Sequence, residues 1–248
     1  MRTVWTFTYA ISFLFYASRK LKQVKKTTTF EQQETIHQVP KKFGKQVVKR
    51  SGSKVVVRGE ENIPEGSFLI VSNHQGNFDI FTLLGYFKKP FGFIAKMELS
   101  RIPVAKPWMD YMGCLFLDRN DRRQSVETFK QGIKMLEQGY NLAIFPEGTR
   151  TKSSEMGEFK SGSFSLAKKS NVPVLPVMIN GTYKSMEANH NRIKPGTFYL
   201  TICEPIMPNE YENMSLQELS DETQRRIQQE LDRLEGVKYK EENSLQSV

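Results

Sequence analysis

The sequence predicts an α/β fold in which a mostly parallel central sheet is flanked by helices, with an uncharged helical segment in front of it. Three observations support this prediction. β-rich runs alternate with helical runs through the middle of the chain. Polar residues follow directly after several apolar runs, which is where sites of α/β folds collect. The segment from Thr3 to Ser18 carries no charged residue.

Length and composition narrow the possible function classes. The 248 residues suit one α/β domain with a small appendage. The net charge of +9 favours an anionic partner, which can be a nucleic acid, a membrane surface or a phosphorylated substrate, although a solvated basic surface gives the same charge. Cys114 and Cys203 belong to no CxxC or Cys/His cluster, so we expect no zinc site and two reduced core thiols.

The N-terminal segment has the composition of a membrane-associating helix. Thr3 to Ser18 contains six aromatic residues, and a basic cluster follows it: Arg19, Lys20, Lys22, Lys25 and Lys26. Sixteen helical residues span about 24 Å, which is short for a bilayer core of about 30 Å. We expect an interfacial or half-inserted anchor; a short span, a cleaved signal or a soluble helix are the alternatives. Residues 27–50 are polar and basic and are expected to form a connector, with room for one helix.

The remaining elements follow from periodicity and turn signals. Predicted strands are Lys54–Arg58, Ser67–Ser72, Phe91–Lys96, Gly113–Leu117, Asn141–Phe145, Val174–Ile179 and Tyr199–Cys203. Predicted helices are Asp79–Phe87, short pieces within Glu98–Met112, a helix through Val126 and Leu136, Ser163–Lys169, and a C-terminal helix with a leucine-rich stripe from Leu216 to Leu234. The predicted division is 1–50 for the N-terminal helix and connector, 51–210 for the catalytic domain, and 211–248 for the C-terminal amphipathic helix and tail.

His74 and Asp79 lie in the segment that follows the apolar run Phe68–Val71. Asn77 can N-cap the next helix, which puts Asp79 in its first turn. The chain can then fold back so that the carboxylate reaches one imidazole nitrogen and leaves the other as a base. Taken alone, this spacing also fits a histidine that caps a strand and an aspartate that favours a helix N-terminus.

Two further segments place charged residues after apolar strands. Phe145-Pro146-Glu147-Gly148-Thr149-Arg150 offers an acceptor, a flexible glycine and a guanidinium that can bind a phosphate bidentately. The strand through Phe116 ends in Asp118 and Arg119, so Arg119 can join Arg150 around one phosphate. A surface turn and a surface ion pair are the plain alternatives for each segment alone.

Together these segments resemble the 1-acylglycerol-3-phosphate acyltransferases of the PlsC type. Asn73, His74 and Asp79 match the family's Asn-His-x4-Asp motif, and Phe145 to Arg150 match Phe-Pro-Glu-Gly-Thr-Arg without change. Further matches are Phe116-x-Asp118-Arg119 and the Val172–Val177 run that contains Pro173 and Pro176. The resemblance covers roughly residues 54 to 206. Gln75-Gly76-Asn77 departs from the family pattern, which often has Gln-Ser followed by an apolar residue or Tyr.

The resemblance implies transfer of an acyl group from acyl-CoA or acyl carrier protein to the sn-2 hydroxyl of 1-acyl-glycerol-3-phosphate, giving phosphatidic acid. His74 would be the base and Asp79 would orient it, while backbone N–H groups at residues 77–79 would stabilise the oxyanion. The implied substrate-binding residues are Asn73, Lys96, Arg119, Glu147, Gly148, Thr149, Arg150 and Lys160. Of these, Arg119 and Arg150 would hold the phosphate and Glu147 would accept a hydrogen bond from the glycerol. Pro173 and Pro176 would line an acyl channel or belong to a buried strand.

No bound cofactor or metal and no nucleic acid is expected, because the acyl carrier arrives as a substrate. The expected partners are lysophosphatidic acid, the membrane surface and, as an alternative donor, acyl carrier protein. The expected location is the cytoplasmic face of a membrane, with the chain monotopic. Another lysophospholipid or glycerol-3-phosphate can replace the acceptor. A thioesterase-like hydrolase and a membrane-binding protein with a dead site are the rival classes, although no Gly-x-Ser-x-Gly nucleophile is present.

Overall fold

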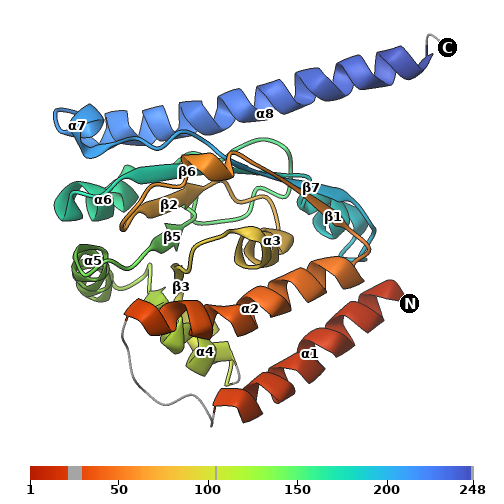
Figure 1. Ribbon diagram of the computed structural model, residues 1–248, viewed down its shortest axis with the longest axis horizontal. Helices are drawn as coiled ribbons and strands as arrows, with labels where there is room; N and C mark the ends of the chain where they lie inside the picture. The colour runs from red at the N-terminus through yellow and green to blue at the C-terminus, as the bar shows by residue number, and fades with distance from the viewer. Residues whose placement is uncertain (22–29, 104, 247–248) are drawn as a thin grey trace.

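The computed structural model describes residues 1–21, 30–103 and 105–246, and its described part contains a seven-stranded sheet flanked by helices (Figure 1). The strand order is β1-β7-β6-β2-β5-β3-β4. The strands are β1 Lys54–Arg58, β2 Leu69–Ser72, β3 Gly92–Lys96, β4 Leu115–Leu117, β5 Leu142–Ile144, β6 Val174–Asn180 and β7 Thr197–Ile202. Every predicted strand region overlaps one of these strands.

The sheet is parallel except at one junction. β4, β3, β5, β2 and β6 run parallel to one another, whereas β7 pairs antiparallel with β6, and β1 pairs parallel with β7. The predicted fold class, a mostly parallel sheet flanked by helices, is therefore confirmed.

Successive side chains of the buried strands point to opposite faces of the sheet, where they pack in two separate cores. Leu69 and Val71 of β2 pack on one face with residues of α5 (Arg122–Glu137), α6 (Ser165–Ser170) and α8 (Leu216–Gln246). Ile70 of β2 packs on the other face against α3 (Phe78–Tyr86). Period-two alternation with both faces apolar is what a sheet covered on both sides requires.

The segment before residue 51 differs from the expected connector. Residues Phe30–Arg50 form a 21-residue helix, α2, which packs on α3. The two helices approach closely where Gly44 meets Gly85: a Cβ on Gly44 would lie 2.7 Å from the amide nitrogen of Gly85. Apolar positions at helical spacing, such as Phe43 and Val47, outweigh the basic composition that suggested a connector.

Helix α1 (Arg2–Leu21) lies beside α2, where Phe13 stacks on Phe43 with ring centroids 4.9 Å apart (Figure 1). Helix α4 (Ala105–Tyr111) also contacts α1, through Trp108. In the described part of the chain, no helix is both long enough and apolar enough to cross a membrane. The cationic collar from Arg19 to Lys26 falls outside the side chains that the structure describes.

The C-terminal helix α8 lies along the face of the sheet opposite α2 (Figure 1). It is preceded by the short helix α7 (Pro208–Tyr211). The predicted stripe is buried at Leu219, Ile227, Leu231 and Leu234, so this helix packs on the domain as expected.

Candidate active site

The polar segments singled out in the sequence meet at one edge of the sheet. β2, β3, β4, β5 and β6 are parallel, so their carboxyl ends lie at the same edge, and each is followed by a loop. Five loops from distant parts of the chain therefore converge there, as expected for an open α/β sheet.

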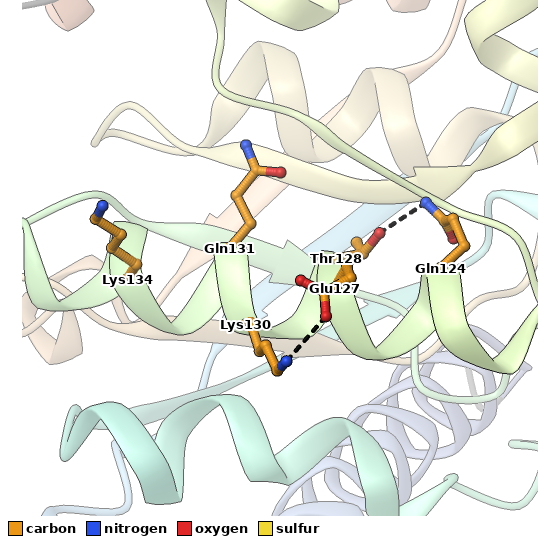
Figure 2. Close-up of a pocket in the computed structure, with 6 residues that line it drawn as sticks. All are labelled: Gln124, Glu127, Thr128, Lys130, Gln131 and Lys134. Atoms are coloured by element: carbon orange, nitrogen blue, oxygen red, sulfur yellow. Dashed lines mark hydrogen bonds and ion pairs between the residues drawn. The ribbon is translucent and has the colours of Figure 1, made fainter.

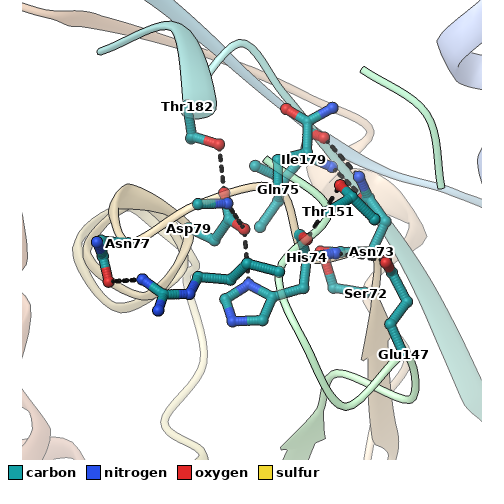
Figure 3. Close-up of polar contacts among 12 residues, drawn as sticks. Ser72, Asn73, His74, Gln75, Asn77, Asp79, Glu147, Thr151, Ile179 and Thr182 are labelled. Atoms are coloured by element: carbon teal, nitrogen blue, oxygen red, sulfur yellow. Dashed lines mark hydrogen bonds and ion pairs between the residues drawn. The ribbon is translucent and has the colours of Figure 1, made fainter. Parts of the chain in front are cut away.

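His74 and Asp79 form a hydrogen-bonded pair at this edge (Figure 3). Nδ1 of His74 lies 2.7 Å from Oδ2 of Asp79, and the Asp79 side chain is fully buried in the first turn of α3. Oδ2 also accepts the N–H of Gly76 at 2.8 Å, which closes the tight turn between the two residues. The bond to Nδ1 leaves Nε2 as the nitrogen that can act as a base, and the His74 side chain is 14% exposed.

The loop after β5 fixes the position of His74. The Phe145 ring stacks on the imidazole with centroids 4.1 Å apart and an interplanar angle of 18°. Thr151 donates its N–H to the carbonyl of His74 at 2.9 Å. The imidazole is thus held by a carboxylate on its edge and an aromatic ring on its face, an arrangement that limits it to one orientation.

Glu147 does not face a substrate in this structure, although it was expected to bind the glycerol. Its side chain is 5% exposed, and its two oxygens accept backbone N–H groups of His74 at 2.7 Å and of Gly157 at 3.0 Å. Burial raises the pKa of the Glu147 carboxyl, while the two N–H donors lower it. Glu147 therefore joins the loop after β5 to the backbone of His74.

Asn73 likewise uses its side chain to bind the protein's own backbone. Its buried amide exchanges two 2.8 Å hydrogen bonds with the backbone of Ile179, which ties the loop after β2 to β6. We therefore assign it to positioning of the loop, whereas the sequence pattern placed it among substrate-binding residues.

The expected capping role of Asn77 is wrong. Its backbone dihedrals are helical and its side chain makes no capping hydrogen bond, because the side-chain oxygen accepts from Arg150. The N–H of Asn77 donates to Glu187 at 2.7 Å, and the N–H of Asp79 donates to the carbonyl of Gly76 at 3.3 Å. These two N–H groups were expected to stabilise an oxyanion, but both are engaged here.

Cationic side chains surround the loop after β5. The Arg119 guanidinium donates to the carbonyl of Gly148. A Cβ on Gly148 would lie 3.2 Å from the Arg119 guanidinium and 3.3 Å from Nζ of Lys160, so the two cations meet at this glycine, whose φ is +73°. Arg150 is half-buried beside Asn77, and its Nη1 is 3.8 Å from Oε1 of Glu187. Of the two arginines expected to hold the phosphate, Arg119 thus meets Lys160 at Gly148, whereas Arg150 contacts Asn77 and Glu187.

The other expected site residues make none of the hydrogen bonds described above. Lys96 is exposed at the end of β3, in register with Leu117 of the neighbouring strand β4. Thr149 is exposed in the loop after β5. Pro176 belongs to β6, all seven residues of which are buried, and the carbonyl of Pro173 accepts the N–H of Leu69 at 2.9 Å. Pro176 is therefore part of the central sheet and Pro173 lies directly before it, and their role in an acyl channel stays a prediction.

Sequence reasoning missed the loop that follows β6. Thr182 donates its hydroxyl to Oδ1 of Asp79 (Figure 3). Gly181 donates its N–H to Oε1 of Gln75 at 2.9 Å, and Glu187 accepts from Asn77. The available signal was the polar run Asn180-Gly181-Thr182 at the end of a parallel strand. It was overlooked because this run lies more than 100 residues from His74.

The thiols and a surface depression on α5 lie away from the pair. Burial raises the pKa of both Cys114 and Cys203 to about 12, so neither is a nucleophile near neutral pH. A depression of about 440 Å³ is lined by six residues of α5 alone (Figure 2): Gln124, Glu127, Thr128, Lys130, Gln131 and Lys134. None of these six residues belongs to the segments from His74 to Asp79, from Phe116 to Arg119 or from Phe145 to Arg150. Among the described residues, no group of three His, Cys, Asp or Glu side chains could hold a metal ion.

The arrangement has the parts that acyl transfer to a hydroxyl requires. A histidine oriented by a buried carboxylate can take a proton, and nearby cations can hold an anionic substrate. Because both thiols stay protonated near neutral pH, we expect the acceptor hydroxyl itself to attack the acyl group.

Comparisons with known proteins agree with this chemistry. The sequence model of the family described as Acyltransferase matches residues 54–180. A probable 1-acyl-sn-glycerol-3-phosphate acyltransferase of Mycoplasma pneumoniae is 34% identical over 72% of this chain and 71% of that protein. The 1-acyl-sn-glycerol-3-phosphate acyltransferase of Saccharomyces cerevisiae is 30% identical over 76% of this chain, which covers 62% of the yeast protein.

A solved structure extends the likeness to the whole fold. The 1-acyl-sn-glycerophosphate acyltransferase PlsC of Thermotoga maritima superposes with a TM-score of 0.83 at 32% identity, and the match covers 94% of this chain and 95% of that one. The resemblance found in the sequence motifs is confirmed by the family match, the relatives and this structure. The chain therefore belongs to the acyltransferase family whose members include the PlsC-type 1-acylglycerol-3-phosphate acyltransferases.

Proposed function

We propose that this enzyme transfers a fatty acyl group from a thioester to the sn-2 hydroxyl of 1-acyl-glycerol-3-phosphate, which yields phosphatidic acid. The names of the relatives support the acceptor. The donor is an acyl-CoA or an acyl carrier protein, because both present the acyl group as the same pantetheine thioester. The observation that carries the proposal is the His74–Asp79 pair at 2.7 Å beside the cations of the loop after β5.

The proposed reaction needs no covalent enzyme intermediate. Nε2 of His74 takes the proton of the acceptor hydroxyl while the oxygen attacks the thioester carbonyl. The tetrahedral intermediate collapses with cleavage of the C–S bond, and the imidazolium gives its proton to the departing thiolate. Asp79 stabilises the imidazolium throughout, since its carboxylate stays buried against Nδ1. Arg119, Lys160 and Arg150 supply the charge that would hold the acceptor phosphate.

An acceptor panel tests this proposal. Purified protein would be given labelled acyl-CoA or acyl carrier protein with lysophosphatidic acid, glycerol-3-phosphate, lysophosphatidylcholine or no acceptor. We expect labelled phosphatidic acid with the first acceptor and little free fatty acid without one. His74→Ala should lower turnover about 10²- to 10⁴-fold while the protein stays folded. Equal release of free fatty acid with and without acceptor would identify a hydrolase instead.

We further propose that α1 holds the enzyme on the cytoplasmic face of a membrane without crossing it. One side of the helix packs on α2 through Phe13, while the opposite side exposes Val4, Phe7, Ile11 and Phe15 at helical spacing. Trp5 is also exposed, at 72%. A continuous apolar stripe on a surface helix favours burial in the headgroup region of a bilayer. Such placement would let the acceptor enter sideways without extraction of its acyl chain into water.

Vesicle partitioning tests the membrane proposal. Deletion of residues 1–26 should lower binding to anionic vesicles and slow turnover on vesicle-borne acceptor, while activity on a short-chain monomeric acceptor survives. A second variant replaces Val4, Ile11 and Phe15 by serine and keeps Phe13, which packs on α2. It should lose vesicle binding as the deletion does. Undiminished vesicle binding by both variants would locate the anchor elsewhere in the chain.

A further inference from the structure

Asp79 has an unusually complete set of hydrogen-bond donors for a buried carboxylate. Its side chain is fully buried. Oδ2 is shared by Nδ1 of His74 and the N–H of Gly76, whereas Oδ1 has one partner among the described residues, the hydroxyl of Thr182. The hydroxyl must donate its proton, because an ionised carboxylate only accepts. The orientation of the catalytic carboxylate therefore depends on a residue 103 positions away.

The backbone around Thr182 is fixed independently of its hydroxyl. Gly181 adopts φ +92° and donates its N–H to the Gln75 side chain at 2.9 Å. The carbonyl of Thr182 accepts the N–H of Ser185 at 3.0 Å, and the hydroxyl of Ser185 donates to the carbonyl of Lys194 at 2.7 Å. Removal of the Thr182 hydroxyl thus leaves the anchors of the loop in place.

We propose that Thr182 is a positioning residue for acyl transfer: its hydroxyl holds the Asp79 carboxylate in the single orientation that presents Oδ2 to His74. This rests on the proposed function of the His74–Asp79 pair. Without the hydroxyl, the buried Oδ1 has no donor among the described residues, which favours rotation of the carboxyl group. A rotated Asp79 no longer presents Oδ2 to His74 and no longer stabilises the imidazolium that forms as the acceptor attacks.

The experiment compares side chains that differ by one oxygen. Thr182→Val keeps the shape and lacks the hydroxyl, Thr182→Ser keeps the hydroxyl, and Thr182→Ala differs from the serine variant by the hydroxyl alone. Thr223→Val is the matched control, since that buried threonine donates to the carbonyl of Leu219 in α8, away from the site. Thermal unfolding of each variant reports whether it folds, and wild-type turnover in the same assay tests acyl transfer itself.

We expect kcat to fall about 10- to 100-fold in the valine and alanine variants, because a hydrogen bond to a charged group is lost. KM for both donor and acceptor should stay within about twofold, since among the described residues the hydrogen bonds of Thr182 go to Asp79 and Ser185 and not to the cations or the loop after β5. The serine variant should keep kcat within about threefold of wild type. In an Asp79→Asn background, Thr182→Val should lower kcat by less than about a further threefold, because the hydroxyl of Thr182 acts through Asp79.

Several outcomes would overturn the proposal while leaving the function intact. One is a folded valine variant with wild-type kcat. A second is a serine variant as impaired as the alanine variant, which would show that the methyl group matters and the hydroxyl does not. A third is full additivity with Asp79→Asn, which would assign Thr182 a structural role only. If the valine variant does not fold, comparison of the serine and alanine variants decides whether the hydroxyl is required.

Discussion

Replacement of Glu147 by glutamine removes one of two carboxylate oxygens that lie between buried backbone N–H groups. In the wild type these oxygens accept from His74 at 2.7 Å and from Gly157 at 3.0 Å, and the side chain is 5% exposed. Glutamine can accept only one of the two bonds, and its NH₂ group then faces the other N–H donor. Glu147→Gln therefore leaves one backbone N–H of the active-site loops without an acceptor.

The expected loss of stability follows from these contacts. One hydrogen bond to a charged group contributes roughly 1.5–3 kcal/mol, and a stranded buried N–H costs roughly 1–3 kcal/mol. Burial of the charge, which raises the pKa of Glu147, is relieved in the variant and offsets part of this loss. We expect a net destabilisation of about 2–4 kcal/mol, which corresponds to a Tm lower by roughly 5–15 °C for a chain of this size.

Activity should change through the position of His74. The histidine backbone loses one of its anchors, so kcat should fall by about tenfold or more, while KM for the acceptor changes little. Thermal unfolding and initial rates measure the two effects. Glu158→Gln is the control, because Glu158 is exposed on the same loop. An unchanged Tm combined with a raised acceptor KM would refute the reasoning and restore the substrate-binding role that the sequence pattern suggested.

Three further substitutions test other parts of the structure. Arg150→Ala should raise KM for a phosphate-bearing acceptor about tenfold or more in initial-rate assays, because a charged donor is lost; a rise in donor KM alone would reverse the assignment. Gly44→Ala should destabilise the protein by about 1–3 kcal/mol in chemical unfolding, since its Cβ would lie 2.7 Å from the backbone of α3, whereas Gly236→Ala in open space should not. Arg225 donates to Glu222 and lowers the pKa of that carboxyl to about 2. The ion pair therefore stabilises the folded protein fully at pH values above the ordinary carboxyl pKa near 4.5, and this stabilisation is lost as pH falls toward 2. The Tm difference between wild type and Glu222→Gln should accordingly be largest at neutral pH and vanish near pH 2; a difference independent of pH would contradict the ion pair.

Local sequence patterns were enough to predict the strands and the contact between His74 and Asp79. The strands were predictable because runs such as Lys54–Arg58 and Val174–Ile179 are β-branched and bounded by turn residues. His74 and Asp79 were predictable as partners because only the four residues from Gln75 to Phe78 lie between them, so their meeting needs no distant segment. The roles of the N-terminal segment and of the cations in binding stay predictions.

Tertiary structure decided which polar residues face a substrate and which hold the site together. Asn73 and Glu147 carry the same functional groups as ligand-binding residues, yet the side chains of both form hydrogen bonds with backbone groups of other segments. Thr182 and Glu187 became part of the site only because β6 lies beside β2, which brings its following loop onto the turn before α3. Composition and spacing report what a side chain can donate or accept, but the partner it finds is set by the order of strands in the sheet. That order depends on contacts between segments more than 100 residues apart, which no local pattern encodes.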